Sequence, residues 1–196
     1  IQDLIERYGI GAERVRYLEL WRRYPSYTQP VHNGHALFFG RINPYKGADN
    51  LVEIVRLCPN IQFDVIGRVD PQMQDVVDQL SKEKNVKLNN NYVTDAEMRE
   101  AFINSDWAIV PYNAYKYSRP VIAFAVGAIP EQVDNGKSGY LVATGDNQKF
   151  AEKLREAMQM SAEQYDAMSR EAYQYGSKKY ATGYAVERFV ALLEEK

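Results

Sequence analysis

The sequence contains a single cysteine, Cys58, among its 196 residues. One cysteine excludes a disulfide within the chain and suits a reducing compartment. Cys58 stands at the end of a predicted helix, where the chain continues with Pro59-Asn60, and no general base lies beside it in the sequence. We therefore interpret Cys58 as a structural thiol and not as a nucleophile.

Histidine is almost as scarce, because His32 and His35 are the only two copies. Two histidines three positions apart could share a metal ion on a helix, but Asn33-Gly34 between them predicts a turn. No serine occupies a nucleophile elbow, so a Ser-His-Asp system has no support either. We predict no metal site.

The chain also lacks a signal peptide, an apolar run of membrane-spanning length and a strong charge of either sign, since its formal net charge is −2. These absences predict a cytoplasmic location and no nucleic-acid partner. No Gly-x-Gly-x-x-Gly opens a predicted helix, and no Gly-x4-Gly-Lys-Ser/Thr is present. Dinucleotide and P-loop interpretations therefore lose their main support.

Short apolar runs alternate with helical patterns along most of the chain. Hydrophobic residues make up 45% of the sequence, as in an ordinary globular protein. This alternation predicts the α/β class, a doubly wound parallel sheet with carboxyl-terminal helices. The predicted strands are residues 36–39, 61–67, 86–88, 108–111, 120–124 and 139–142, and the predicted helices are residues 51–57, 71–83, 94–105, 146–158, 161–178 and 183–195.

Three regions follow from this pattern. Residues 1–35 form a lead-in with a helix over 1–9, a short strand over 15–18 and a loop over 21–34. Residues 36–160 form the sheet domain, and residues 161–196 form terminal helices. Because the chain begins at Ile1 without methionine, we interpret it as a piece of a longer protein.

The stretch Ala36–Gly47 is the most informative part of the sequence. A buried strand ends at Gly40, and Arg41 and Lys46 follow it. In open α/β sheets, ligands bind at the carboxyl ends of the strands. Arginine can form two hydrogen bonds to phosphate oxygens, and lysine adds a mobile point charge. The motif therefore predicts capture of a diphosphate, and the alternative is a surface turn with two solvated cations.

The other strand ends add small, basic and aromatic residues to the same predicted crevice. They are Gly67-Arg68, Asn91-Tyr92-Val93, Pro111-Tyr112 and residues 127–131. Together they provide cations for phosphate and a Tyr-Val pair that could lie against a planar base, but no strong nucleophile. This combination favours binding of a nucleotide-activated group over hydrolysis.

The order of these motifs resembles the carboxyl-terminal, Rossmann-like domain of GT-B glycosyltransferases of the retaining family 4 type. The resemblance covers roughly residues 36–160, and its motifs are specific only in combination. The matching pieces are Gly40-Arg41-x4-Lys46-Gly47, Phe63-Asp-Val-Ile-Gly67, Ala108-Ile-Val-Pro111, Arg119-Pro-Val-Ile-Ala123, Val126-Gly-Ala-Ile-Pro-Glu131 and Asp134-Asn-Gly-Lys-Ser-Gly139.

The resemblance assigns roles to individual residues. Gly40, Arg41 and Lys46 would hold the donor diphosphate, and Glu131 would contact the sugar or ribose. The residues that would bind the nucleotide are Arg68, Val69, Tyr92 and Val93. Structural alternatives stay open: Arg68 could pair with Asp70, Tyr92 could serve in packing, and Glu131 could only cap the following turn.

The sequence departs from the family pattern between the strands at 108–111 and 120–124. The family carries a Glu-x7-Glu-like element there, and neither acid is present. Only Tyr112–Arg119 separate Pro111 from Pro120, whereas two parallel strands need a crossover of a dozen or more residues. We therefore expect that a segment containing the acids is missing between Asn113 and Ala114.

The resemblance implies transfer of a glycosyl group from a nucleotide diphosphate sugar to an acceptor. The reaction would be hexosyltransferase-like, would retain the configuration of the sugar and would need no cofactor. The acceptor would lie mostly on a missing amino-terminal domain, through which alone the enzyme would touch a membrane. This chain would be inactive by itself. Two alternatives stay open: a non-catalytic sugar-nucleotide-binding subunit and a nucleotide-sugar 2-epimerase.

Overall fold

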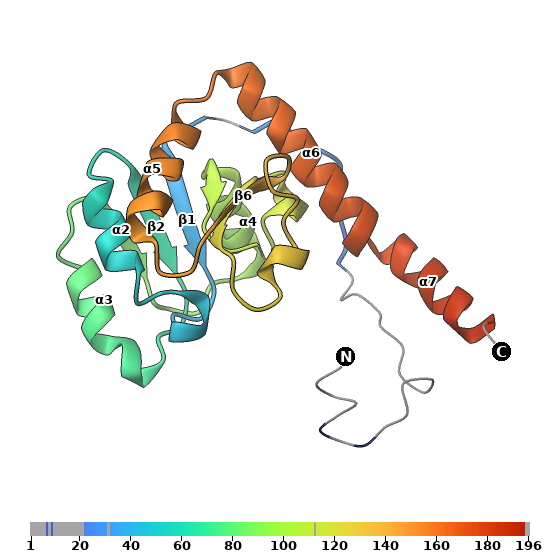
Figure 1. Ribbon diagram of the computed structural model, residues 1–196, viewed down its shortest axis with the longest axis horizontal. Coiled ribbons are helices and arrows are strands. Elements are labelled where there is room, and N and C mark those ends of the chain that lie inside the picture. Colours follow the sequence, from blue (N-terminus) through green and yellow to red (C-terminus); the bar gives the residue numbers. More distant parts are fainter. Residues whose placement is uncertain (1–6, 8, 10–21, 31, 112, 195–196) are drawn as a thin grey trace.

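A computed structural model describes residues 7, 9, 22–30, 32–111 and 113–194. Its centre is a parallel sheet of six strands (Figure 1). The helix expected over residues 1–9 lies almost wholly outside the described residues, and so does the strand expected over residues 15–18.

The strand order is β3-β2-β1-β4-β5-β6, and every pairing is parallel. This order places β1 and β4 side by side at the point where the sheet begins to grow in the opposite direction. Such a switch point leaves a crevice at the carboxyl ends of the strands. The predicted fold class is therefore confirmed. The strands are β1 (His35–Phe39), β2 (Gln62–Ile66), β3 (Val86–Asn89), β4 (Trp107–Ala108), β5 (Val121–Phe124) and β6 (Gly139–Val142).

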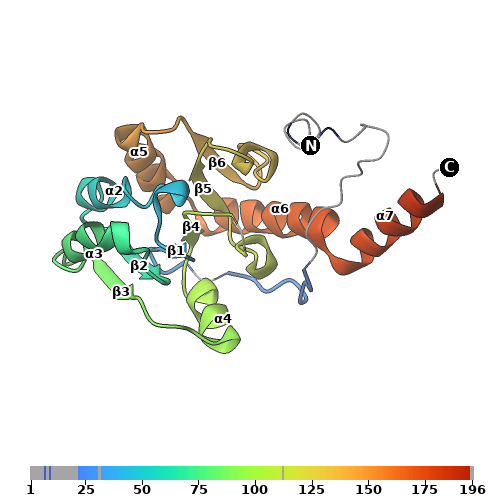
Figure 2. The same cartoon turned by 90° about the horizontal axis from the view of Figure 1, so that it is seen from below.

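Helices cover both faces of the sheet (Figures 1 and 2). One face packs against α2 (Leu51–Leu57), α3 (Gln74–Leu80) and α5 (Asn147–Met158). The other face packs against α4 (Asp95–Ile103) and the short 3-10 helix η4 (Tyr115–Tyr117). Three more 3-10 turns are η2 (Pro44–Lys46), η3 (Pro71–Met73) and η5 (Ile129–Glu131), so the predicted helix over 71–83 is a 3-10 turn followed by α3.

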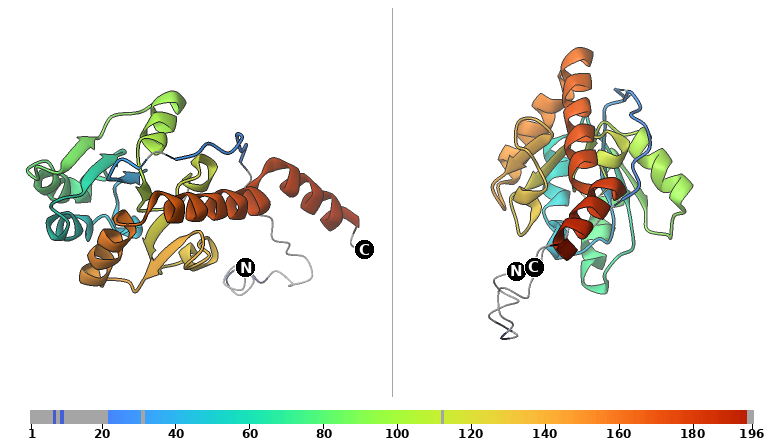
Figure 3. Two further views of the ribbon diagram at one scale, coloured as in Figure 1. Left: turned by 90° about the horizontal axis from the view of Figure 1, so that it is seen from above. Right: turned by 90° about the vertical axis from the view of Figure 1, so that its right-hand side faces the viewer.

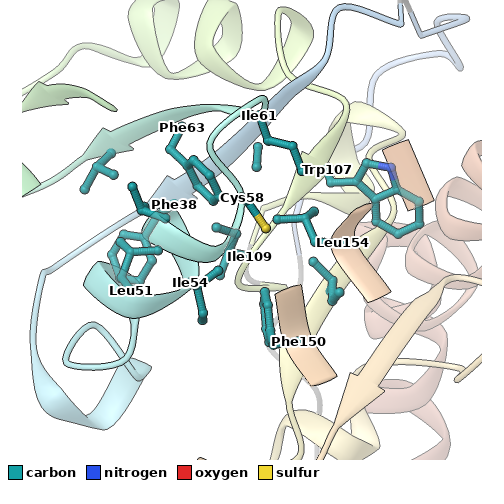
Figure 4. Packing of buried hydrophobic residues seen from close by; sticks show 14 of the residues in the cluster. Phe38, Leu51, Ile54, Cys58, Ile61, Phe63, Trp107, Ile109, Phe150 and Leu154 are labelled. Atoms are coloured by element: carbon teal, nitrogen blue, oxygen red, sulfur yellow. The ribbon is translucent and has the colours of Figure 1, made fainter. Parts of the chain in front are cut away.

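The side chains of β1 alternate between the two faces, as the period of a strand requires. Phe38 packs on the side of α2 and α5, and Leu37 packs on the side of α4. Cys58 lies among the first set, close to Ile54 and Leu154 (Figure 4). Burial raises the pKa of the Cys58 thiol, which supports its interpretation as a structural residue.

Two predicted helix starts are confirmed in detail. Thr94 and Glu97 form a reciprocal capping box at the start of α4. The Asp146 carboxylate accepts a hydrogen bond of 2.9 Å from the Lys149 amide at the start of α5. Both caps satisfy backbone amides that would otherwise lack a partner within the helix.

The connection from β4 to β5 differs from the prediction. β4 covers only Trp107–Ala108, whereas the sequence predicted a strand over 108–111. The backbone turns at Pro111, whose carbonyl accepts a 3.0 Å hydrogen bond from the Ala114 amide. Residues 109–120 then carry the chain through η4 to a parallel β5, so twelve residues are enough to join the two strands. The segment expected between Asn113 and Ala114 stays a prediction.

The terminal helices are α6 (Ala162–Tyr180) and α7 (Thr182–Glu194). The first half of α6 packs into the core, where Tyr165 is 2% exposed. The segment 22–30 runs along α6: the Tyr27 hydroxyl donates to Asp166 at 2.7 Å, and the Tyr173 hydroxyl donates to the Pro25 carbonyl at 2.7 Å. α7 extends away from the body of the molecule (Figure 3).

Candidate functional site

The loops that follow β1 and β2 are joined through their backbones at the carboxyl edge of the sheet. The Gly40 amide donates a 2.8 Å hydrogen bond to the Ile66 carbonyl, and the Ile42 amide donates a 2.8 Å bond to the Arg68 carbonyl. Gly40 has φ = +125°, a conformation that favours glycine. The two loops therefore form one layer beneath the residues that carry the positive charge.

Lys46 lies over this layer. Asn43 accepts a 3.1 Å hydrogen bond from the Lys46 amide and so fixes the η2 turn, which ends at Gly47 with φ = +70°. The Lys46 ammonium group rests against Gly40, on the side where any larger residue would carry its Cβ. The absence of a side chain at Gly40 thus leaves the space that the ammonium group occupies.

Two effects lower the pKa of Lys46 from the ordinary lysine value of 10.5. Partial burial disfavours the charged form, and the nearby Arg41 guanidinium disfavours it further by repulsion. The structure therefore brings Arg41 and Lys46 close enough for their charges to interact. A bound anion would relieve this repulsion, which is the electrostatic character of a phosphate site.

Arg41 has one carboxylate neighbour. Its Nε lies 3.5 Å from Oδ1 of Asp70, and its side chain is 58% exposed. The alternative in which Arg68 pairs with Asp70 is therefore wrong, because Asp70 pairs with Arg41. Arg68 follows β2 and is exposed. An exposed ion pair of this length contributes little free energy, so Arg41 can exchange Asp70 for a phosphate at little cost.

A cleft of about 180 Å³ opens beside Lys46, on the β4 and β5 side of β1. Tyr45 from η2 reaches across its mouth, and its hydroxyl oxygen is 3.5 Å from the position of a Cβ built on Gly127. The lining is mostly apolar. It consists of residues 44–47, Asp49, Asn50, Leu51, Ile54, Ile109, Val110, Ala123, Phe124, Val126, Ile129 and Thr144.

The residues predicted to bind the nucleotide follow β2 and β3, on the other side of β1 from the cleft. Arg68 is exposed, and Val69 pairs with Ile42 through a backbone bridge. Tyr92 is 85% exposed, so the alternative in which it serves in packing is wrong. Val93 is half-buried beside it. Their contact with a base stays a prediction.

Glu131 ends η5 and is exposed. Its carbonyl oxygen accepts hydrogen bonds from the Tyr175 hydroxyl, at 3.0 Å, and from the Lys179 ammonium group. Its backbone is therefore tied to α6, while Ile129 in the same turn lines the cleft. Contact of Glu131 with a sugar or ribose stays a prediction.

Sequence reasoning missed most of the cleft. Tyr45, Val126 and Thr144 line it, and none of them was singled out as a site residue. Tyr45 could have been predicted as a site residue, because it is a large aromatic residue next to Lys46 in the loop that follows a strand. Val126 and Thr144 belong to separate loops, and only the folded sheet brings them together.

The two histidines have separate partners. Nδ1 of His32 is 2.8 Å from the Asp106 carboxylate, and Nδ1 of His35 is 2.7 Å from the Asp64 carboxylate. Within residues 22–30, 32–111 and 113–194, no group of three His, Cys, Asp or Glu side chains is placed to hold a metal ion. In the same part of the chain, no helix is long and apolar enough to cross a membrane.

Two cations thus lie at the carboxyl edge of a doubly wound sheet, beside a cleft at the switch point, which is where proteins of this architecture bind their ligands. Residues 27–175 match the sequence model of the family described as Glycosyl transferases group 1. The chain belongs to this family.

Part of this chain is also similar to a curated protein. A curated relative from Klebsiella pneumoniae, an uncharacterized 41.2 kDa protein in the cps region, is 29% identical over 128 residues, which are 59% of this chain and 34% of that protein. The chain thus spans about a third of the relative's length.

Two crystal structures share the fold, both with a TM-score of 0.78. Sucrose-phosphate synthase from Thermosynechococcus elongatus is 17% identical, and the match covers 99% of this chain and 55% of that one. A TarM variant from S. aureus, in a complex that includes UDP, is 16% identical, and the match covers 97% of this chain and 42% of that one. The fold is therefore the α/β Rossmann-like fold of GT-B glycosyltransferases.

Proposed function

We propose that this chain is the donor-binding half of a retaining glycosyltransferase of the family 4 type, and that it holds a nucleotide diphosphate sugar. The observation that carries the proposal is the proximity of the Arg41 and Lys46 charges at the carboxyl edge of β1. Two cations held close together against their mutual repulsion attract an anion more strongly than either does alone, and a diphosphate carries several oxygens that both can contact.

The chemistry follows from the leaving group. When the bond between the sugar and the diphosphate breaks, negative charge grows on the diphosphate. Arg41 and Lys46 are already in place to stabilise that charge in the transition state. Lys46 is fixed by its contact with Gly40 and by the Asn43 cap, so it reorganises little when the charge develops.

The same proposal includes a partner domain that carries the acceptor. The apolar side chains of α7 repeat on one face at helical spacing, and Val186, Phe189, Val190 and Leu193 are each at least 46% exposed. Such a face usually packs against another surface. We propose that the amino-terminal domain of the same enzyme covers it.

A direct binding measurement tests the proposal. The 196-residue chain is titrated with UDP, GDP and ADP and with their hexose derivatives in a calorimeter, and we expect saturable binding to one nucleotide series. Variants Arg41→Ala and Lys46→Ala should weaken it, whereas Arg56→Ala, an exposed arginine paired with Glu83, should not. Failure of every nucleotide to bind would refute the proposal.

A non-catalytic subunit that only binds a sugar nucleotide is the second candidate. Among the described residues that line the cleft, the only carboxylate is Asp49, which is exposed and accepts a hydrogen bond from Asn50. Donor hydrolysis and transfer by the full-length parent separate the two functions. The isolated chain should show binding without turnover, and full transfer by this chain to a simple acceptor would show that the catalytic machinery is misplaced here.

A further inference from the structure

We propose that the cleft beneath Tyr45 binds the donor sugar and selects one that carries a methyl group, either as a deoxy sugar or as an acetamido sugar. This inference rests on the proposed function and deepens it, because it names the class of sugar. Three observations carry it: the position of the cleft in the sheet, the chemistry of its walls and the engagement of its polar rim.

The position of the cleft separates the sugar from the base. Lys46 lies over the end of β1, where the diphosphate would sit. Arg68 and Tyr92 follow β2 and β3 on one side of β1, and the cleft lies on the other side, beside β4 and β5. A nucleotide with its base toward β3 therefore directs its sugar into the cleft.

The walls of the cleft are apolar. Ile109 and Val110 directly follow β4, and Phe124, Val126 and Ile129 come from β5 and the loop after it. A sugar hydroxyl placed against these side chains would lose its water without gaining a partner, which is costly. A methyl group in the same place would instead gain free energy by leaving water.

The polar groups at the rim have partners within the protein. The Thr144 hydroxyl donates to the Ala125 carbonyl at 3.3 Å, and the Asn50 amide group donates to the Asp49 carboxylate at 3.3 Å. The Tyr45 ring is 67% exposed and bounds the mouth opposite Gly127. The exposed Tyr45 ring can therefore pack against the C–H groups of a sugar ring. The Thr144 and Asn50 side chains already have partners and are less available to bind the sugar hydroxyls.

The test compares sugars that differ in one substituent. Once the preferred nucleotide is known, the chain is titrated with the nucleotide hexose, its 6-deoxy counterpart and its 2-acetamido counterpart. We expect one methyl-bearing donor to bind about four- to tenfold more tightly than the plain hexose. The 6-deoxy and acetamido arms identify the source of the methyl group. Equal or tighter binding of the plain hexose would overturn the inference and leave the proposed function standing.

Two variants locate the contact. Val126→Thr keeps the shape of a half-buried side chain but adds a hydroxyl, and it should reduce the methyl preference at least threefold without changing the affinity for the nucleoside diphosphate. Val186→Thr on the exposed face of α7 is the matched control and should change neither quantity. Tyr45→Ala, at an exposed position, should weaken the nucleotide sugar but not the nucleoside diphosphate.

The outcomes are distinguishable. If Val126→Thr and Tyr45→Ala weaken the nucleoside diphosphate as much as the nucleotide sugar, the base occupies the cleft and the inference is wrong. If no nucleotide binds to the chain at all, the proposed function fails and this inference fails with it.

Discussion

The carbonyl oxygen of Gly40 occupies the space that a Cβ on Gly67 would need. Gly67 has φ = +155°, and its own amide donates a 2.9 Å hydrogen bond to the Asn89 carbonyl. The loops after β1 and β2 can therefore lie this close only because residue 67 has no side chain. The position of Lys46 is linked to the same contact, because its ammonium group rests against Gly40.

Gly67→Ala should therefore destabilise the protein by about 3 kcal/mol or more, at the upper end of single-substitution effects. The added Cβ would meet backbone atoms, which have no rotamer to change. The measurement is the free energy of unfolding in urea. Gly183→Ala in α7 is the control, because a Cβ there meets nothing within 4 Å, and it should leave stability unchanged or slightly higher. Equal stabilities for the two variants would contradict the packing described here.

Lys46→Ala and Arg41→Ala should each weaken nucleoside diphosphate binding by about 1.5–3 kcal/mol, the range for hydrogen bonds to charged groups. Asp70→Asn should strengthen binding slightly, because it removes the carboxylate that lies 3.5 Å from Arg41. Calorimetric titration gives all three values. Unchanged affinity in both alanine variants would place the diphosphate elsewhere.

Diphosphate affinity should fall as the pH rises through the pKa of Lys46, because only the protonated amine attracts phosphate. Burial and, to a smaller extent, repulsion from Arg41 lower that pKa from the ordinary lysine value, so the fall should begin at a lower pH than for an ordinary lysine. Arg41→Gln removes the repulsion but not the burial and should move the fall to higher pH, although affinity at neutral pH drops. Titrations from neutral pH to about pH 10 test this. Lys46→Arg provides the control, since arginine stays charged and should show no such fall.

Arg119→Met should destabilise the fold by about 2–4 kcal/mol. Arg119 is 1% exposed, and it donates hydrogen bonds of 2.6 Å and 2.7 Å to the carbonyls of Phe102 and Ile103 at the end of α4. Methionine fills a similar volume but removes both hydrogen bonds, and the Phe102 carbonyl then keeps a 3.4 Å bond from the Ser105 amide. Urea unfolding measures the loss. A stability equal to wild type would mean that water replaces the guanidinium.

Sequencing the coding region of the parent should reveal additional residues between Asn113 and Ala114, including at least one acidic residue. The reason is the departure of this stretch from the family pattern, because neither acid of the Glu-x7-Glu-like element is present. The intact mass of the purified parent checks the same point. A natural chain in which Asn113 is followed directly by Ala114 would contradict the prediction.

The sheet was predictable from the sequence because each strand is a short apolar run that ends at a glycine, a proline or a polar turn. The doubly wound class followed from the alternation of strands and helices, and the helix starts at Thr94 and Asp146 were visible as local spacing. The end of β4 was not predictable, since Ile109 and Val110 are as apolar as a strand requires. Only the turn at Pro111 ends it.

The cations of the site could be predicted because they lie together in one motif, six positions from Gly40 to Lys46. The cleft could not, because its walls come from η2, α2, β5 and the segments that follow β4, β5 and β6. The ion-pair partner of Asp70 could not be predicted either, because the choice between Arg41 and Arg68 depends on how two loops pack against each other. A motif of a few neighbouring residues can be recognised in the sequence, whereas the shape of a cavity depends on how distant segments pack.

A backbone bridge between Arg22 and Ala181 holds the two ends of residues 22–181 side by side. The Arg22 amide donates a 2.7 Å hydrogen bond to the Tyr180 carbonyl, so the chain enters the described sheet domain and leaves it at neighbouring points. A domain with adjacent entry and exit can be transplanted into a surface loop of an unrelated host without stretching either protein. Residues 22–181 could therefore be inserted into a host protein as one segment, because its two ends need only a short gap in the host loop.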